Sequence, residues 1–598
     1  MNIFYKVFNL LTLPEKKKSF LLLLMIVLMG FLDTAGLVSI LPFLTILSNP
    51  DLIETNNLLN IIFEYTKTFG VQNKEQFLFF LGVVIFLFFI FSLSFKALTS
   101  YAMARFTQIR EYSIGKRLIE SYLHQPYSWF LNKHSANLGK NILSEVENVV
   151  NKGINSILVL VSQSVVVLFI VIILMITDIF LALTLFFILG TMYVIISIIT
   201  KNKVKNLGKV SFKANEDRYT VIAEAFGASK EVKVGNLEKA FISKFNTPSF
   251  TYATSQATLS ILMQMPRFIL EGIGFGGMLI VTLYLMSFSD NFGSTVPIIT
   301  LYAFAAYRLM PAIQQIFVAF GSLRYVQPAI DAVSSDLENL KNTVKYFDKT
   351  NKILLNQSIV LNNIKYYYPN TSKPVLKNIN IEILSNNTVG IIGPTGSGKT
   401  TVVDLVLGLL EPNEGSLTVD DQLIDNHNRS QWQNSIGYIP QHIYLADDTI
   451  YNNIAFGLEY EKIDKQAVEL AAKSANLHDF ICNELTLGYN TKIGERGVRL
   501  SGGQRQRIGI ARALYHNPQV LIMDEATSAL DNFTEQLVMD ALNNLGKNKT
   551  IIIIAHRLNT LRECDKIFIM GKGEITASGT YEELKSNNKY FKEAVNKK

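Results

Sequence analysis

The chain has 598 residues, too many for one hydrophobic core, so two or more domains are expected. Its net charge of +7 is modest, and the sequence shows no nucleic-acid-binding module. Its two cysteines, Cys482 and Cys564, lie far apart without metal-ligand spacing. This excludes a cysteine-based metal site and predicts thiols in a reducing compartment.

Apolar residues make up 49% of the chain and are unevenly distributed. Residues 1–330 hold long apolar segments, residues 331–356 form a linker, and residues 357–598 have the pattern of an α/β domain. A segment needs about 20 apolar residues to cross a bilayer. Six segments are long enough, namely 19–47, 76–104, 155–177, 179–200, 260–287 and 295–323.

Lysine and arginine predict how these segments are oriented, because cytoplasmic loops carry the basic excess. Ten basic residues lie in 201–250 and seven in 102–154, whereas the loop 48–75 has two and the loop 287–294 has none. Both termini and the two long loops are therefore expected in the cytoplasm, and three shorter loops outside.

The first outward loop contains an amphipathic segment, "LIETNNLLNIIFEYTKTF". Its apolar residues recur at helical spacing, so it could lie on the outer membrane surface or pack on the spans. The two inward loops also show helical periodicity with mixed charge. They are predicted to continue the spans into the cytoplasm, where they could carry motion between the membrane and a soluble motor.

The first chemical motif of the soluble part is "GPTGSGKT", residues 393–400. Its glycines allow successive backbone N–H groups to meet phosphate oxygens. Lys399 is expected to neutralise the β- and γ-phosphates, and the Thr400 hydroxyl to bind Mg²⁺. The preceding "TVGII" predicts a short buried strand, and a helix opening after the loop directs its positive end at the anion.

A second predicted strand, "VLIMDEATSALD", ends in Asp524 and Glu525. Its four apolar residues are typical of a strand buried in a parallel sheet. Asp524 suits the Mg²⁺ shell, and Glu525 suits polarising the water that attacks the γ-phosphate. Between the two motifs lies "RLSGGQRQRIGIARAL", in which Ser501, Gly502 and Gly503 open a helix that could present N–H groups to another phosphate.

These motifs together resemble the nucleotide-binding domain of ABC transporters, over residues 357–598. The resemblance implies that the LSGGQ signature of one domain closes on ATP held by a second domain. It assigns adenine stacking to Tyr368, sensing of Mg²⁺ and water to Gln441, the interdomain loop to Asp531 and the γ-phosphate switch to His556. The implied nucleotide-binding residues are Tyr368, Gly393, Pro394, Thr395, Gly396, Ser397, Gly398, Lys399, Thr400, Thr401, Ser501, Gly502, Gly503, Gln504 and Asp531. The implied catalytic residues are Glu525, His556 and Gln441, and the implied Mg²⁺ ligands are Thr400, Gln441 and Asp524.

Six spans followed by one such domain resemble an exporter half-transporter. The expected fold is therefore an all-α, six-helix transmembrane domain followed by an α/β P-loop domain. The expected activity is ATP hydrolysis coupled to transport by a homodimer, with ATP and Mg²⁺ as cofactors. A membrane ATPase without a transported substrate is disfavoured, because every catalytic motif is present.

Inserting an ionisable side chain at the bilayer centre costs roughly 2.5–3.5 kcal/mol of free energy on insertion scales. Each such residue within a span therefore suggests a charged partner or a cavity where a substrate could bind. One interpretation is structural: Arg267 pairs with Glu271 at i,i+4, while Lys96 and Arg324 lie near span ends. The other is a cationic cavity for an anionic head group. The ionisable candidates are Asp33, Lys96, Arg267, Glu271, Arg308 and Arg324, of which Lys96, Arg267 and Arg308 would face the substrate.

Three short stretches narrow the resemblance to PglK-type flippases for lipid-linked oligosaccharides: "PRFILEGIGF", "YRLMPA" and "FKAL". In the last, Lys96 stands where that type carries arginine. The resemblance implies flipping of a polyprenyl-pyrophosphate-linked oligosaccharide across the bacterial inner membrane for protein glycosylation, with the nucleotide-binding domain in the cytoplasm. The alternatives are export of another amphipathic lipid, of the lipid A type, or of drugs.

Overall fold

The computed structural model describes residues 3–39, 43, 46–47, 50–68, 70–177, 179–288, 292–340, 351–369, 371–526, 535–536, 539, 549–555 and 557–596. The chain divides into two compact units. The first comprises residues 1–125 and 133–344, and the second comprises residues 126–132 and 345–598. Residues 126–132, which include the short helix α7 (Tyr127–Phe130), thus group with the second unit although they lie within the first loop that is predicted to face inward.

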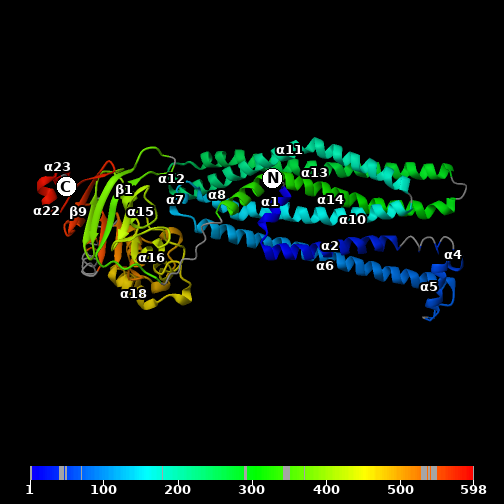
Figure 1. Ribbon diagram of the computed structural model, residues 1–598, viewed down its shortest axis with the longest axis horizontal. Helices are drawn as coiled ribbons and strands as arrows, with labels where there is room; N and C mark the ends of the chain where they lie inside the picture. Colours follow the sequence, from blue (N-terminus) through cyan, green and yellow to red (C-terminus); the bar gives the residue numbers. More distant parts are fainter. Residues whose placement is uncertain are drawn as a thin grey trace. The chain divides into compact units, whose positions relative to one another are not determined.

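The first unit is helical throughout its described part (Figure 1). Its helices are α1 (Ile3–Leu10), α2 (Leu13–Val38), α4 (Leu52–Thr55), α5 (Asn57–Lys67), α6 (Lys74–Leu123), α8 (Ser135–Lys140), α9 (Val146–Asn148), α10 (Asn155–Thr177), α11 (Ile179–Gly227), α12 (Ser229–Val234), α13 (Glu238–Phe288) and α14 (Phe292–Asn339). Two π-helical turns, η1 (Asn141–Glu145) and η2 (Val149–Ile154), interrupt the run from α8 to α10.

Within the described residues, three helical stretches are both long enough and apolar enough to cross a membrane, Leu13–Gly36, Lys74–Leu123 and Ser135–Ile176. The other three predicted spans lie within the continuous helices α11, α13 and α14. The predicted end of the first span at residue 47 falls mostly outside the described residues. As expected for the inward extensions, α6 and α11 continue as helices well past the predicted ends of their spans.

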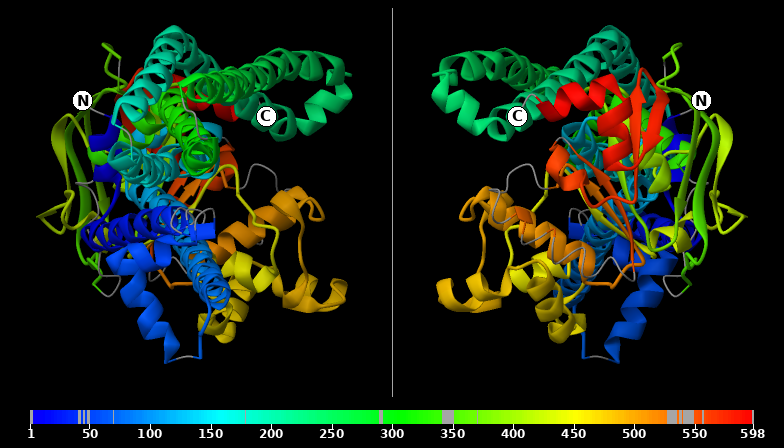
Figure 2. Two further views of the ribbon diagram at one scale, coloured as in Figure 1. Left: turned by 90° about the vertical axis from the view of Figure 1, so that its right-hand side faces the viewer. Right: turned by 90° about the vertical axis from the view of Figure 1, so that its left-hand side faces the viewer.

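Two groups of helices make up this unit (Figure 2). α2 packs against α6 and α10, whereas α11 and α13 run side by side, joined by α12, on the opposite side of the unit. α14 contacts α10, α11 and α13, so it joins the two groups. The apolar core follows this arrangement, with one buried cluster around Met29, Leu174 and Leu309 and another around Leu259 and Phe317.

The outward amphipathic segment forms α5, which packs by one face on the start of α6. Leu59 and Phe63 lie against a buried cluster that includes Phe77, and the rings of Phe63 and Phe77 meet edge to face at 5.3 Å. Ile62 and Tyr65 on the same helix remain exposed. Packing on the spans is therefore one role of this segment, and its exposed face leaves the membrane-surface interpretation open.

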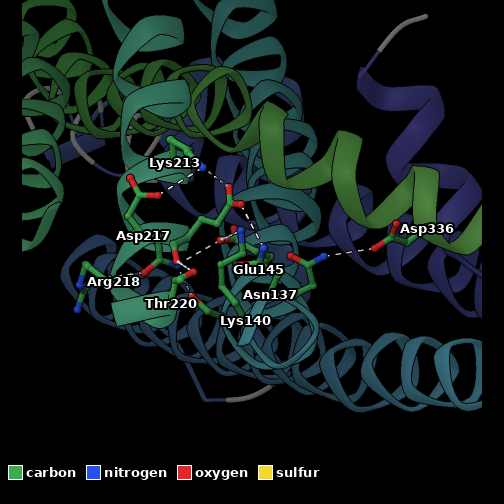
Figure 3. Close-up of polar contacts among 12 residues, drawn as sticks. Asn137, Lys140, Glu145, Lys213, Asp217, Arg218, Thr220 and Asp336 are labelled. Carbon is green, nitrogen blue, oxygen red and sulfur yellow. Dashed lines mark hydrogen bonds and ion pairs between the residues drawn. The ribbon is translucent and has the colours of Figure 1, made fainter. Parts of the chain in front are cut away.

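A polar seam joins the two extensions that are predicted to face inward (Figure 3). Lys140, the last residue of α8, and Glu145, the last residue of η1, are almost completely buried, and their charged groups lie 3.8 Å apart. Asn215 of α11 donates a hydrogen bond to Glu145 at 3.2 Å, and Asn137 donates to Glu216 at 3.2 Å. Buried charges are stable only when they are paired and hydrogen-bonded, so this seam holds α8 and η1 against α11 in one register.

α11 and α14 lie close together at Gly208, where a methyl group would lie 2.2 Å from the carbonyl oxygen of Tyr325. Gly208→Ala is therefore expected to force the helices apart and to destabilise the unit by about 1–3 kcal/mol. The melting temperature in detergent should fall relative to wild type. Gly190→Ala on the same helix is the matched control, because no atom lies within 4 Å of the added methyl group there. Equal melting temperatures for the two variants would contradict the close contact.

The second unit contains two sheets in its described part. One is antiparallel, in the order β2-β1-β4-β5, and the other has the order β10-β9-β3-β8-β7-β6, parallel from β9 to β6 with β10 antiparallel at the edge. Their strands are β1 (Ser358–Tyr366), β2 (Leu376–Leu384), β3 (Thr388–Ile392), β4 (Glu414–Val419), β5 (Gln422–Leu423), β6 (Ile436–Ile439), β7 (Val520–Asp524), β8 (Thr550–Ile554), β9 (Lys566–Gly571) and β10 (Glu574–Gly579).

Helices surround the mainly parallel sheet of the second unit. They are α15 (Lys399–Val406), α16 (Arg429–Gln433), α17 (Ile450–Ile454), α18 (Lys465–Ser474), α19 (His478–Glu484), α20 (Gly502–Leu514), α22 (Tyr581–Asn587) and α23 (Lys589–Asn596), with 3₁₀ turns η4 (Tyr460–Lys462), η5 (Gly488–Asn490), η6 (Glu495–Gly497) and η7 (Leu558–Leu561). β7 and β8 are buried at every position, as expected for central strands covered on both faces. Both cysteines are free, Cys482 exposed and Cys564 buried, and burial raises the pKa of the Cys564 thiol to about 12.

Candidate active site

The glycine-rich loop joins β3 to α15, as the sequence predicts. Gly396 and Gly398 have φ of +79° and +102°, which residues with a side chain rarely adopt. At Gly393 the reason for glycine is space, because a methyl group would lie 2.3 Å from the carbonyl oxygen of Met570. The first N–H groups of α15 have no partner within the helix, so the loop ends in donors suited to an anion.

Lys399, the first residue of α15, turns back over this loop. Its ammonium donates to the carbonyl oxygens of Gly393 at 2.9 Å and Pro394 at 3.2 Å. Burial lowers the pKa of Lys399, and the nearby carboxylates of Glu525 and Asp524 oppose that shift. The lysine is thus a desolvated cation held by neutral carbonyl groups, and a phosphate would be a stronger partner.

The two carboxylates lie at the end of β7, the strand between β6 and β8. Asp524 is buried, and Glu525 follows it with φ of +50°, a strained conformation for a residue with a side chain. Gln441 Nε2 donates to Glu525 Oε2 at 2.5 Å, and the backbone N–H of Glu525 donates to the carbonyl of Ile554 at 3.1 Å. These contacts fix where the Glu525 carboxylate points.

A nucleotide fits the polar groups of this site. The hydroxyl oxygen of Ser397 is buried without a hydrogen-bond partner in the described part of the chain, which leaves it available to a phosphate. Thr400 is exposed at the start of α15, and with Asp524 and Gln441 it offers only oxygen ligands of the kind that Mg²⁺ prefers. The Tyr368 hydroxyl shares a hydrogen bond of 3.1 Å with Thr401, so the proposed adenine-stacking residue lies beside the phosphate loop.

The signature residues form the N-terminus of α20, a helix of 13 residues. Ser501 accepts a hydrogen bond from the backbone N–H of Gln504, and the Gln504 side chain accepts one from the backbone N–H of Ser501. This reciprocal capping box leaves the backbone groups of Gly502 and Gly503 at the open end of the helix. Among the described residues, Ser501 has no hydrogen bond to the glycine-rich loop of its own chain.

Two predicted site residues, Asp531 and His556, lie outside the described residues. The structure describes one contact near them in the chain that the sequence does not indicate. Arg557, which follows His556, donates a hydrogen bond to the largely buried side chain of Glu535 at 2.5 Å. A second group missed from the sequence is Asp404, one turn into α15. Burial and the Asp524 carboxylate raise the pKa of Asp404 to about 6. An acidic residue one turn after the glycine-rich motif could have been noticed, but not its burial.

The structure brings together two of the three predicted substrate residues. Lys96 of α6 and Arg308 of α14 both pair with Asp33 of α2, at 3.0 Å and 3.2 Å. Arg267 of α13 instead pairs with Glu271 at 2.7 Å on an exposed part of the helix. Its side chain is 67% exposed, and within the described chain it contacts neither of the other two cations by hydrogen bond or ion pair.

Comparison with known families gives two matches along the chain. The family described as "ABC transporter transmembrane region" matches residues 52–312, and the family described as "ABC transporter" matches residues 376–528. A solved bacterial Atm1-family ABC exporter with ATP bound shares the fold, with a TM-score of 0.78 at 21% identity over 97% of this chain and 98% of that one. The expected fold, a helical transmembrane domain followed by an α/β nucleotide-binding domain, is therefore confirmed.

Two relatives illustrate the range of similar proteins. An ATP-dependent lipid A-core flippase of Wigglesworthia glossinidia brevipalpis is 29% identical over 490 residues, which cover 79% of this chain and 80% of the relative. A putative multidrug export ATP-binding/permease protein of Staphylococcus aureus is 42% identical over 226 residues, 38% of this chain and 39% of the relative. The chain spans 18–44% of the length of the first curated relatives that it matches.

Proposed function

The chain belongs to the ABC transporter family as an exporter half-transporter, and from that premise we propose that a homodimer of it moves an amphipathic, phosphate-bearing lipid across a membrane at the expense of ATP. One transmembrane region and one ATP-binding domain per chain support a dimer, since the glycine-rich loop and the signature of one chain have no mutual hydrogen bond within the described residues. The proposed location is the bacterial inner membrane, because a similar flippase of Wigglesworthia glossinidia brevipalpis matches 79% of the chain. The basic loops support an orientation with the ATPase in the cytoplasm.

The ATPase residues have separable tasks. The backbone of the glycine-rich loop and Lys399 would hold the phosphates, while Thr400, Asp524 and Gln441 would hold Mg²⁺, which neutralises charge on the transferring phosphate. Glu525 accepts the hydrogen bond from Gln441 and orients and polarises the attacking water. A signature helix from the second chain would complete each site, so hydrolysis would require the two domains to close.

The proposed substrate class rests on two neighbouring cations inside the membrane domain, Lys96 and Arg308, which both pair with Asp33. They lie beside an apolar cluster that includes Leu174 and Leu309, and these same two residues line a cavity of about 150 Å³ between α10, α11 and α14. Neither cation is among the residues that line this cavity, but cations beside an apolar cluster suit a molecule with a phosphate head and a hydrocarbon tail, because the head cannot cross hydrocarbon unaided.

The phosphate could belong to either of two lipids. The relative named as a lipid A-core flippase covers 79% of this chain and supports a lipid A type of substrate. The sequence resemblance to PglK-type flippases supports a polyprenyl-pyrophosphate-linked oligosaccharide, with a role in protein glycosylation. Of these, we favour the lipid A type, since its support extends over most of the chain rather than over three short stretches.

Reconstitution tests this function directly. Wild-type protein in liposomes is expected to move fluorescent lipid A, or a polyprenyl-pyrophosphate-linked oligosaccharide, between leaflets at least tenfold faster with ATP than without it. The matched control is the same polyprenyl oligosaccharide without its pyrophosphate, which should not move faster with ATP. ATP-driven movement of neither phosphate lipid, or equal movement of the control, would contradict the proposed substrate class.

A further inference from the structure

Three charged side chains from three different helices meet in the membrane domain. Asp33 of α2 accepts from Lys96 Nζ of α6 at 3.0 Å and from Arg308 Nη1 of α14 at 3.2 Å. The carboxylate is buried, with 4% of its side chain exposed, whereas the lysine and arginine side chains are 37% and 24% exposed. The negative charge is therefore on the inner side of the cluster and the positive charges are on its accessible side.

The surroundings of this cluster are apolar. Met29 lies one helical turn before the aspartate, and Ala305 and Leu309 flank the arginine. These three residues belong to one buried apolar cluster, and Phe95, which directly precedes the lysine, packs against it. In such an environment each unpaired charge is costly, so the charges are retained only with partners or for a function. The neighbouring Thr34 hydroxyl is committed to the carbonyl of Gly30 at 2.7 Å and does not serve the carboxylate.

The cluster is not electrically balanced, because one carboxylate faces two cations. Arg308 uses only Nη1 toward Asp33, and its Nε and Nη2 groups have no acceptor among the described residues. Lys96 likewise uses one bond to the carboxylate, although an ammonium can donate three. One positive charge and several donors are thus left for an anion that approaches from the accessible side, and a guanidinium fork suits phosphate.

We propose that Asp33 is a built-in counter-ion, which holds Lys96 and Arg308 in the empty transporter and is displaced from them by the phosphate of the lipid substrate. This inference rests on the proposed function and adds to it how the site is regulated. A phosphate carries more negative charge than a carboxylate and offers more acceptors, so it can replace Asp33 at both cations. When the lipid leaves, Asp33 pairs with them again, which limits substrate affinity and allows release.

Removing the competing charge should therefore tighten binding of phosphate lipids. Wild-type protein and Asp33→Asn are placed in phosphatidylcholine nanodiscs, and ATP hydrolysis is titrated with lipid A, undecaprenyl pyrophosphate and undecaprenol. For Asp33→Asn the half-saturating concentration is expected to fall about tenfold for the phosphate lipids and not at all for undecaprenol. The phosphate lipid with the larger change identifies the source of the head group.

Glu271→Gln is the matched control, because it also removes a carboxylate that pairs with an arginine in the membrane domain, Arg267 at 2.7 Å, but outside the cluster. Its half-saturating concentrations should equal those of wild type. An unchanged or higher half-saturating concentration in Asp33→Asn would overturn the proposal, and would show that the ion pairs only hold the helices together. A shift of the same size for undecaprenol would also overturn it.

A second variant keeps the test decisive if Asp33→Asn does not fold. Asp33→Asn combined with Lys96→Gln has the same net charge in the cluster as wild type, with one cation fewer. It is expected to bind phosphate lipids at least as tightly as wild type, because no carboxylate competes, and weaker binding would overturn the proposal. If wild type itself responds to none of the lipids, the proposed function fails first, which distinguishes the two outcomes.

Discussion

Glu525→Gln is expected to lower ATP hydrolysis by about 100-fold or more, the range of a positioned general base, while ATP still binds. The reason is the geometry at the end of β7, where the Glu525 carboxylate accepts a hydrogen bond from Gln441 at 2.5 Å beside the buried Asp524. The substitution keeps the size of the side chain, removes its negative charge and replaces one acceptor oxygen with an amide NH2 group. The glycine-rich loop and Lys399 are unchanged, so phosphate binding should persist. Steady-state phosphate release and equilibrium binding of a fluorescent ATP analogue measure the two effects.

The matched control is Glu414→Gln, which removes an exposed carboxylate of the same domain that pairs with Lys365 at 2.9 Å. Because surface ion pairs contribute little, its ATP hydrolysis should equal that of wild type. Hydrolysis by Glu525→Gln within a factor of about two of wild type would remove Glu525 from the catalytic role. Loss of ATP binding together with hydrolysis would point to a folding defect instead.

A mixed dimer of a Lys399→Ala chain and a Ser501→Arg chain is expected to recover ATP hydrolysis, to more than ten times the rate of either mutant homodimer. If the signature acts on ATP held by the partner, both defects fall in one composite site and the other site is intact. Lys399 alone should account for a large loss, because a charge-assisted bond to phosphate is worth about 1.5–3 kcal/mol. Chains with two different affinity tags allow the mixed dimer to be purified and its hydrolysis measured.

The reciprocal pairing is the control for this experiment. Here one chain carries both substitutions and its partner is wild type, so each composite site has one defect and hydrolysis should stay near that of the mutant homodimers. Greater activity for this pairing than for the mixed dimer would contradict action between chains. Ser501→Ala is expected to be milder than Ser501→Arg, because it removes the hydroxyl and weakens the helix cap but adds no bulk in front of the N–H groups of Gly502 and Gly503.

Much of the second unit could be predicted from its sequence, since its signals are local. The buried strand before residue 393 and the helix after it appear where "TVGII" and the apolar spacing place them, as β3 and α15. The apolar run ending in Asp524 is a strand buried at every position. The phosphate-binding groups of the loop are backbone N–H groups of consecutive residues. A short sequence motif is therefore enough to predict the geometry of the loop. Its catalytic roles stay predictions for the experiments above.

The sequence alone also predicted one ion pair of the membrane domain, the pair whose two residues lie on the same helix. Arg267 and Glu271 are one helical turn apart, and they pair at 2.7 Å as the i,i+4 spacing predicts. The alternative, in which Arg267 joins Lys96 and Arg308 in one cavity, is not supported by this placement. An amphipathic period likewise predicted the outward helix, but not which of its faces packs on α6.

Tertiary structure alone decided where the remaining charges meet. Asp33 lies 63 residues from Lys96 and 275 from Arg308 in the chain, so no spacing rule connects them. They meet only because α2, α6 and α14 pack with these positions facing one another, and that packing depends on the shapes of many apolar side chains at once. The buried Lys140 and Glu145 are a similar case, since their stability depends on Asn215 of another helix. Sequence specified the nucleotide chemistry because it is encoded in contiguous motifs, whereas the charge cluster of the membrane domain exists only in the packed helices.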